Sequence, residues 1–287
     1  MNGWRRREFL AVTTAFAAPL SARGAALDLS ALEARHGGRI GIAAHDLTSG
    51  RRTGWRAGER FAYCSTFKLF LAAAVLQRVA AGRERLDRQV PVTAADIVMH
   101  APVTGPMAGK TMSVEALCAA MVDVSDNPAA NIMIRQIGGL DAWRAWYRSI
   151  GDRLTTVDRF EPALNSAKPG DPRDTTTPHQ AATNVGQVLA GDLLTLAHRA
   201  LLTRWAVATP TGPGRIKAGV PAGSIVAHKT GTADPGPTND IGLVWLPDGR
   251  VIAVAAYFTE SSAPTQADRD AVIAAATRAA IAALSSP

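Results

Sequence analysis

The chain has 287 residues, of which 47% are hydrophobic and 19% are charged, and its formal net charge is +7. This length and apolar content suffice for one large domain or two intimate subdomains around a substantial core. Beyond the N-terminal segment there is no run of like charges and no stripe of basic and aromatic residues, so nothing supports nucleic-acid binding.

The first 26 residues are typical of an export signal. Arg5-Arg6-Arg7 precede a short stretch of small apolar residues that leads to Ala25-Ala26. A charged start, a short apolar centre and a small-residue exit mark a cleavable signal that is too short to span a bilayer. Arg6-Arg7-Glu8-Phe9-Leu10 fits the twin-arginine type, which a receptor reads. We therefore expect export to the periplasm or the medium, no membrane anchor after cleavage, and one domain over residues 27–287.

The elements in chain order predict strands at both ends and helices between them. A short helix at 28–35 is followed by strands at 39–46 and around 52–55. The Ala-rich middle predicts helices at about 65–81, 114–121, 128–136, 140–150 and 181–199. Strands return at about 224–233, 241–246 and 251–258, the last two joined by Pro247-Asp248-Gly249, and a final helix runs from about 265 to 283.

This order predicts an α+β fold in which both chain ends form one antiparallel sheet flanked by helices. Residues of about 27–60 and 207–287 form the α/β lobe, and residues of about 61–206 form an inserted all-α lobe. The site is expected in the cleft between the lobes. The irregular stretch 159–177 is long enough to be functional, and the opposite charges of Arg159 and Asp174 are expected to close it as an Ω-shaped loop.

Cysteine and histidine spacing gives no sign of a metal. Export allows a disulfide between Cys64 and Cys118, but both lie in apolar helical patterns, which favours buried free thiols. The histidines show no ligand spacing, so we infer no metal and no cofactor.

Ser65 and Lys68 begin the apolar run 69–76. In a helix, residues three apart share a face, and a hydroxyl near the N-terminus lies where free backbone N–H groups favour negative charge. A partly desolvated amine one turn later could accept the hydroxyl proton. Taken alone, the pair is a weak signal and is better explained as a capping serine followed by a solvated lysine.

Three further motifs follow, and each has an ordinary structural explanation when taken alone. Ser125-Asp126-Asn127 could cap a helix, Glu161-Pro162-Ala163-Leu164-Asn165 could carry a solvated glutamate, and Lys229-Thr230-Gly231-Thr232 could be a plain strand. Four such motifs in this order, on these kinds of element, are hard to attribute to chance.

Ser-x-x-Lys, Ser-Asp-Asn and Lys-Thr-Gly form the motif set of class A β-lactamases and penicillin-binding proteins. The sequence resembles a class A serine β-lactamase over essentially the whole mature chain. Glu161 with Asn165 favours a β-lactamase, since class A enzymes use this loop carboxylate to activate a hydrolytic water. The resemblance implies hydrolysis of the β-lactam ring of penicillins and cephalosporins through a serine acyl-enzyme, which gives antibiotic resistance.

The resemblance also implies catalytic roles. Ser65 is the nucleophile and Lys68 is its close partner, while Ser125 passes a proton to the departing lactam nitrogen. Whether Lys68 or Glu161, through a water, takes the serine proton stays open. Glu161 also holds the deacylating water, and the backbone N–H groups of Ser65 and Thr232 receive the oxyanion.

The implied substrate-binding residues surround that nucleophile. Asn127 binds the acylamino carbonyl of the substrate, and Asn165 helps to hold the water. The substrate carboxylate meets a set of strand residues and an arginine: Lys229, Thr230, Gly231, Thr232 and Arg215. Arg215 is chosen because residues 237–240 carry no cation; the alternative is a solvated surface arginine.

The sequence departs from the family pattern at a few positions. His228 stands where the family usually has an aspartate, and His100 stands where many members place an aromatic residue at the cleft mouth. Cys64, with Thr232 and Arg215, is similar to members that hydrolyse carbapenems. Those often bridge this cysteine to one at the position of Ala233, so carbapenem hydrolysis stays open.

Two alternative functions are retained at this stage. One is a D,D-peptidase that releases penicillin slowly, and the other is a non-catalytic peptidoglycan-binding protein. The intact motif residues argue against both. We expect a monomer whose partners are small-molecule β-lactams.

Overall fold

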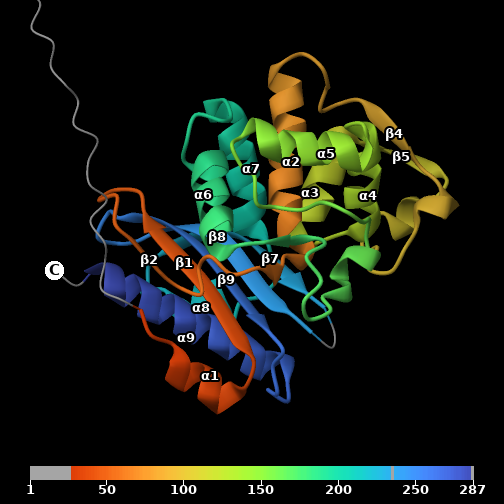
Figure 1. The fold of residues 1–287 in the computed structure, drawn as a ribbon. Coiled ribbons are helices and arrows are strands. Elements are labelled where there is room, and N and C mark those ends of the chain that lie inside the picture. The colour runs from red at the N-terminus through yellow and green to blue at the C-terminus, as the bar shows by residue number, and fades with distance from the viewer. Residues whose placement is uncertain (1–26, 234–235, 286–287) are drawn as a thin grey trace, which may run out of the picture.

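The computed structural model describes residues 27–233 and 236–285, and the predicted export signal at 1–26 lies outside them. At its centre is a five-stranded antiparallel sheet in the order β2-β1-β9-β8-β7 (Figure 1). The strands are β1 (Arg39–Asp46), β2 (Arg52–Trp55), β7 (Ile225–Thr232), β8 (Thr238–Trp245) and β9 (Val251–Thr259). The first and last parts of the chain therefore pair in one sheet, which confirms the predicted α+β class.

Helices cover both faces of this sheet. On one face lie α1 (Ser30–His36), α8 (Ile216–Gly219) and the long α9 (Gln266–Ser285), as Figure 1 shows. Alternate residues of β9 point to opposite faces, so Val254 and Phe258 join the cluster under α9 while Ala255 and Tyr257 join the other cluster. Every residue of β9 from Ile252 to Phe258 is buried, so both faces of the sheet are apolar here.

The second cluster is built around α2 (Phe67–Ala80), which is buried from Phe67 to Leu76. A helix that is apolar on all sides belongs in a core, and α2 is surrounded by other helices. These are α3 (Val114–Asp123), α4 (Asn127–Gln136), α5 (Gly139–Ser149), α6 (Pro178–Leu189) and α7 (Leu196–Ala208). Short hairpin strands β4 (Gln89–Val92) and β5 (Lys110–Ser113) lie at the outer end of this part of the molecule (Figure 1).

The single predicted helix at 181–199 is wrong, because this stretch contains most of α6, a connection and the start of α7. Gly191 lies in the connection, and the Thr195 hydroxyl accepts a hydrogen bond from His198 N to cap α7. The start of α2 also differs from the prediction, since Ser65 lies in a 3₁₀ turn, η1 (Cys64–Thr66), just before the helix. The α8 helix and the β4–β5 hairpin were not predicted.

The loop 159–177 is closed by the predicted ion pair. Arg159 Nε lies 2.6 Å from Asp174 Oδ2, and the aspartate side chain is fully buried. Within the loop, η4 (Ala163–Ser166) forms a 3₁₀ turn, and β6 (Thr175–Thr176) pairs with β3 (Phe61–Ala62). The ion pair and this small sheet together anchor the loop against the helical part of the molecule.

Cys64 and Cys118 are both buried and free, as the apolar patterns indicated. Two further 3₁₀ turns, η2 (Ala94–Asp96) and η3 (Gly105–Met107), shape the segment between α2 and α3. No helix among residues 27–233 and 236–285 is both long and apolar enough to cross a membrane.

Candidate active site

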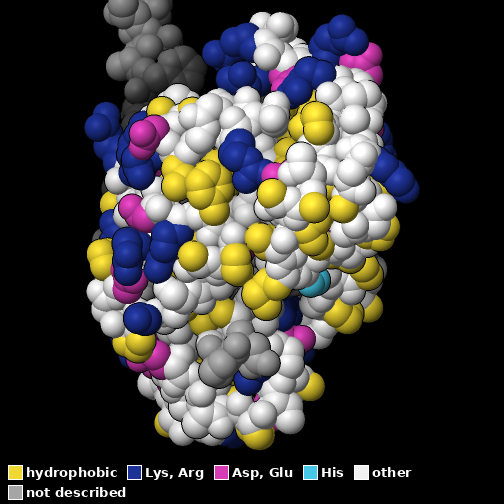
Figure 2. Space-filling model, turned by 90° about the vertical axis from the view of Figure 1, so that its right-hand side faces the viewer, with side chains coloured by type: hydrophobic (Ala, Val, Ile, Leu, Met, Phe, Trp, Pro, Cys, Tyr) yellow, Lys and Arg dark blue, Asp and Glu magenta, His cyan; other side chains and the backbone are white. Residues whose placement is uncertain are grey.

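On the face drawn in Figure 2, Lys and Arg side chains are spread over the upper and left parts with Asp and Glu among them.

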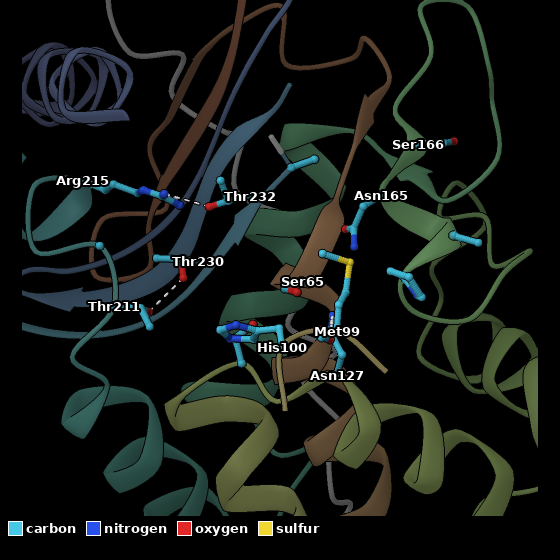
Figure 3. A pocket seen from close by; sticks show the side chains of 15 residues that line it. Ser65, Met99, His100, Asn127, Asn165, Ser166, Thr211, Arg215, Thr230 and Thr232 are labelled. Atoms are coloured by element: carbon cyan, nitrogen blue, oxygen red, sulfur yellow. Dashed lines mark hydrogen bonds between the residues drawn. The ribbon is translucent and has the colours of Figure 1, made fainter. Parts of the chain in front are cut away.

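A cavity of about 690 Å³ lies between the helical part of the molecule and the edge strand β7. Figure 3 shows the side chains that line the cavity, with Ser65 near the centre of the view. The predicted site residues that line it are Ser65, His100, Ser125, Asn127, Asn165, Arg215, Thr230 and Thr232. The other four, Lys68, Glu161, Lys229 and Gly231, are buried close to it.

Ser65 is held by the η1 turn, where β7 approaches the backbone closely. A Cβ atom on Gly231 would lie 2.7 Å from the Tyr63 carbonyl oxygen, so only glycine permits this approach. Ser65 Oγ accepts a hydrogen bond from Lys68 Nζ at 2.8 Å and donates to Glu161 Oε1 at 3.1 Å. The hydroxyl therefore contacts both candidate proton acceptors directly.

Lys68 is fully buried on the first turn of α2. Its Nζ lies 3.1 Å from Glu161 Oε1, donates to the Ser125 carbonyl at 2.8 Å, and reaches Ser125 Oγ at 3.3 Å. Burial lowers the pKa of Lys68 below its usual value, and the Glu161 carboxylate opposes this shift. A lowered pKa favours the neutral amine, which is the form that can accept a proton.

Lys229 is a second fully buried amine. Its Nζ donates to the Thr230 carbonyl at 2.9 Å. Burial lowers the pKa of Lys229 well below its usual value, and the positive charge of Lys68 lowers it further. Buried groups whose pKa values are shifted in this way are typical of functional sites.

The Ser125-Asp126-Asn127 motif does more than supply the predicted serine and asparagine. Ser125 has a left-handed backbone with φ of 63°, and Asp126 is fully buried. The Asp126 carboxylate caps α4 through Ala129 N and accepts from Val103 N and Thr104 N. Asp126 therefore holds the segment around Val103 and Thr104 in place. Its position between Ser125 and Asn127 in the motif could have suggested such a role.

Glu161 is held in place by a residue that the sequence reasoning missed. Asn131 accepts a hydrogen bond from Glu161 N and donates one to Glu161 O, both at 2.9 Å. Glu161 Oε2 accepts from Asn165 Nδ2 at 2.5 Å, while Asn165 Oδ1 is buried with no partner among the described residues. The signal for Asn131 was a polar residue on α4, which is otherwise strongly apolar at these positions.

The sequence profile described as the beta-lactamase enzyme family matches residues 25–284. The chain belongs to this family. It is 41% identical to beta-lactamase CTX-M-8 of Citrobacter amalonaticus, over 86% of this chain and 85% of that protein. It is also 41% identical to beta-lactamase L2 of Stenotrophomonas maltophilia, over 94% of this chain and 95% of that protein.

Solved structures agree with the sequence comparison. An ancestral class A β-lactamase matches with a TM-score of 0.86 and 49% identity, over 89% of this chain and 98% of that chain. The protein is therefore a class A serine β-lactamase, an enzyme that hydrolyses β-lactams and gives resistance to them. The α+β fold and the enzyme class predicted from the motifs are both confirmed.

In this β-lactamase Arg215 is not a solvated surface residue, since it is only 4% exposed. Its Nε pairs with Asp270 at 2.7 Å, and Nη1 donates to the carbonyls of Gly231 and Asn239. Nη2 donates to Thr232 Oγ1 at 2.8 Å, the contact drawn in Figure 3. The guanidinium group thus supports the strand residue expected to receive substrate.

His100 lies at the cavity with a left-handed φ of 60°. Its Nε2 is 2.9 Å from the Val124 carbonyl oxygen, and its own carbonyl accepts from Asn127 N. These contacts hold the ring beside the cavity. No group of three or more His, Cys, Asp or Glu side chains that could hold a metal ion occurs in the described part of this β-lactamase.

Proposed function

We propose that this enzyme opens the β-lactam ring of penicillins and cephalosporins by forming an acyl-enzyme on Ser65. The observation that carries the proposal is the position of Ser65 Oγ, 2.8 Å from Lys68 Nζ and 3.1 Å from Glu161 Oε1. Both contacts are within the reach of direct proton transfer.

In the acylation step, Ser65 Oγ attacks the lactam carbonyl carbon and gives its proton to Lys68 or Glu161. The ring C–N bond then breaks, and Ser125 passes a proton to the nitrogen. Lys68 Nζ, 3.3 Å from Ser125 Oγ, can return that proton to Ser125. The backbone N–H groups of Ser65 and Thr232 receive the oxyanion, and one such donor is worth about 3–4 kcal/mol.

In the deacylation step, a water molecule attacks the ester carbonyl and gives its proton to Glu161. The unpartnered Asn165 Oδ1, next to the Glu161 carboxylate, offers a second acceptor for this water. The Ser65–acyl bond breaks, the proton returns to Ser65 Oγ, and the opened acid leaves. The glutamate held by Asn131 is thus assigned the hydrolytic half of the cycle.

Substrate is proposed to bind through its two polar ends. Asn127 contacts the acylamino carbonyl, and His100 borders that end of the cavity. The carboxylate meets Thr230, Thr232 and Arg215, with the charge of Lys229 close by. Four of the five guanidinium N–H groups of Arg215 have partners among the described residues, which leaves one on Nη2 for the carboxylate.

Export and assembly complete the proposal. Residues 1–26 act as a twin-arginine signal, and residues 27–287 work in the periplasm as one monomeric catalytic domain with an α/β and an all-α lobe. N-terminal sequencing of the secreted protein tests the cleavage point. Its molar mass by light scattering tests the monomer.

The decisive experiment is turnover of a chromogenic cephalosporin with intact-mass analysis of the protein. The wild-type enzyme should turn over many equivalents, which excludes a slow penicillin-releasing peptidase and a non-catalytic binding protein. Glu161→Ala should accumulate an adduct of one drug molecule, and Ser65→Ala should form none. Full multiple turnover by either variant would contradict the assigned roles, and the same assay with a carbapenem tests that class.

A further inference from the structure

We propose that His228 and Asp240 form a buried positioning pair that holds Arg215 in the geometry needed to bind the substrate carboxylate. This inference rests on the proposed role of Arg215 as the carboxylate anchor. It assigns a role to the histidine that stands directly before Lys229, on the opposite face of β7 from that lysine.

His228 and Asp240 meet on the face of the sheet that α8 and α9 cover. In the β7–β8 register His228 lies opposite Gly242 and Thr230 opposite Asp240, so His228 and Asp240 are diagonal neighbours. His228 Nδ1 lies 2.9 Å from both carboxylate oxygens of Asp240, and both side chains are fully buried. An ionised carboxylate only accepts hydrogen bonds, so Nδ1 carries the proton in this pair.

Asp240 extends the contact to the segment that carries Arg215. Its Oδ2 accepts a hydrogen bond from the backbone N–H of Ile216 at 3.1 Å, the residue directly after Arg215. The carbonyl of Asn239, directly before Asp240, accepts from Arg215 Nη1 at 2.8 Å. Two consecutive residues near the start of β8 therefore hold both the backbone next to Arg215 and its guanidinium group.

The guanidinium group of Arg215 in turn positions a residue that lines the cavity. Arg215 Nη2 holds Thr232 Oγ1 at 2.8 Å, and Thr232 lines the cavity next to the nucleophile. A shift of the Asp240 carboxylate would move Ile216 N and, with it, the base of the arginine side chain. His228 thus acts through Arg215 and touches no substrate itself.

The imidazole is needed here for one hydrogen bond. His228 Nε2 is buried with no partner among the described residues, so only Nδ1 has a polar contact. A buried carboxylate that loses such a donor is left partly unpaired, which is strongly disfavoured, so its side chain shifts toward other partners. Asparagine places an amide N–H near the position of Nδ1, whereas leucine fills similar space without a donor.

The test compares His228→Leu and His228→Asn, each in the wild-type enzyme and in an Arg215→Ala background. With a penicillin as substrate, His228→Leu should raise KM about tenfold with little change in kcat, the scale of losing one hydrogen bond to a charged group. His228→Asn should stay within about twofold of wild type, since it restores the donor. In the Arg215→Ala background, His228→Leu should add no further loss.

Two controls separate positioning from folding. Thermal melts report the fold of each variant. Thr277→Val removes a different fully buried polar group, a hydroxyl on α9 whose hydrogen bond goes to the Ile273 carbonyl and to none of the residues that hold Arg215. This control should leave KM unchanged. If His228→Leu does not fold, Asp240→Asn carries the same test, with the same expected rise in KM and the same dependence on Arg215.

The outcomes distinguish two failures. If Arg215→Ala alone leaves kcat/KM unchanged with the fold intact, the carboxylate role of Arg215 fails and this inference fails with it. A second result overturns only the positioning role of His228. In it, Arg215→Ala lowers kcat/KM, but His228→Leu leaves KM unchanged or raises KM by the same factor in the wild-type and Arg215→Ala backgrounds. A His228→Asn variant as poor as His228→Leu also overturns it.

Discussion

The Asp174 carboxylate is the main anchor of the loop that carries the proposed hydrolytic glutamate. It accepts hydrogen bonds from Arg159 Nε, the backbone N–H groups of Asp158 and Arg159, and the Tyr63 hydroxyl. We predict that Asp174→Asn loosens this loop. Asparagine is chosen over alanine because residue 174 has φ of +54°, which asparagine tolerates and alanine does not.

The magnitude follows from what remains around Arg159. Removing one partner of a buried ion pair typically costs about 3–5 kcal/mol. The Arg159 side chain is 18% exposed and keeps a 2.7 Å contact with Ser166 Oγ. Because Arg159 is not left fully buried and unpaired, we expect the free energy of unfolding to fall by about 3 kcal/mol, the lower end of that range. For a chain of this size that corresponds to a fall in Tm of about 6–12 °C.

The assay is hydrogen exchange across residues 159–177 together with Tm and the rate of deacylation. Exchange should accelerate in this segment, and deacylation should slow because Glu161 belongs to it. Asp171→Asn is the matched control: Asp171 lies 3.7 Å from Arg159, and its shorter bonds go to the exposed Arg173. Asp171→Asn should lower the free energy of unfolding by less than about 1 kcal/mol. Equal effects of the two substitutions, or unchanged exchange in Asp174→Asn, would refute the argument.

Three further predictions concern other parts of the enzyme. Burial, and to a smaller extent the nearby His179 and Arg52, lowers the pKa of His45 to about 3. Between about pH 6.5 and 3 the unfolded chain therefore binds a proton at this residue that the folded enzyme does not bind. Stability should therefore fall by about 2 kcal/mol from pH 7 to pH 5, and a denaturant titration of His45→Gln should lose that contribution. Burial raises the pKa of the Cys64 and Cys118 thiols, so a thiol reagent should label both only in denaturant, and rapid native labelling would contradict this. Asn131→Ala should lower kcat about tenfold by freeing the Glu161 backbone, and rapid quench should show an accumulating acyl-enzyme; unchanged kcat would remove Asn131 from the site.

Local patterns in the sequence were enough to predict the order of the elements and the class of fold. Short apolar runs bounded by turn residues marked β1, β8 and β9, and the longer continuous apolar run after Lys68 marked the buried helix α2. The pattern failed at 181–199 because the alanine-rich composition continues across the break between α6 and α7. Composition measures helix propensity over a window, whereas a single glycine and a capping threonine decide where a helix stops.

The sequence by itself also determined the motif residues, since their chemistry depends on residue type and on spacing within one element. Only the tertiary structure decided what surrounds them. Ser65 and Glu161 are separated by 96 residues and meet through the closed loop, and Asn131 supports Glu161 from another helix. The burial of Arg215 and its contacts to β7, β8 and α9 likewise arise where the sheet edge meets the helices. Such contacts come from the packing of whole elements, and local sequence periodicity carries no information about them.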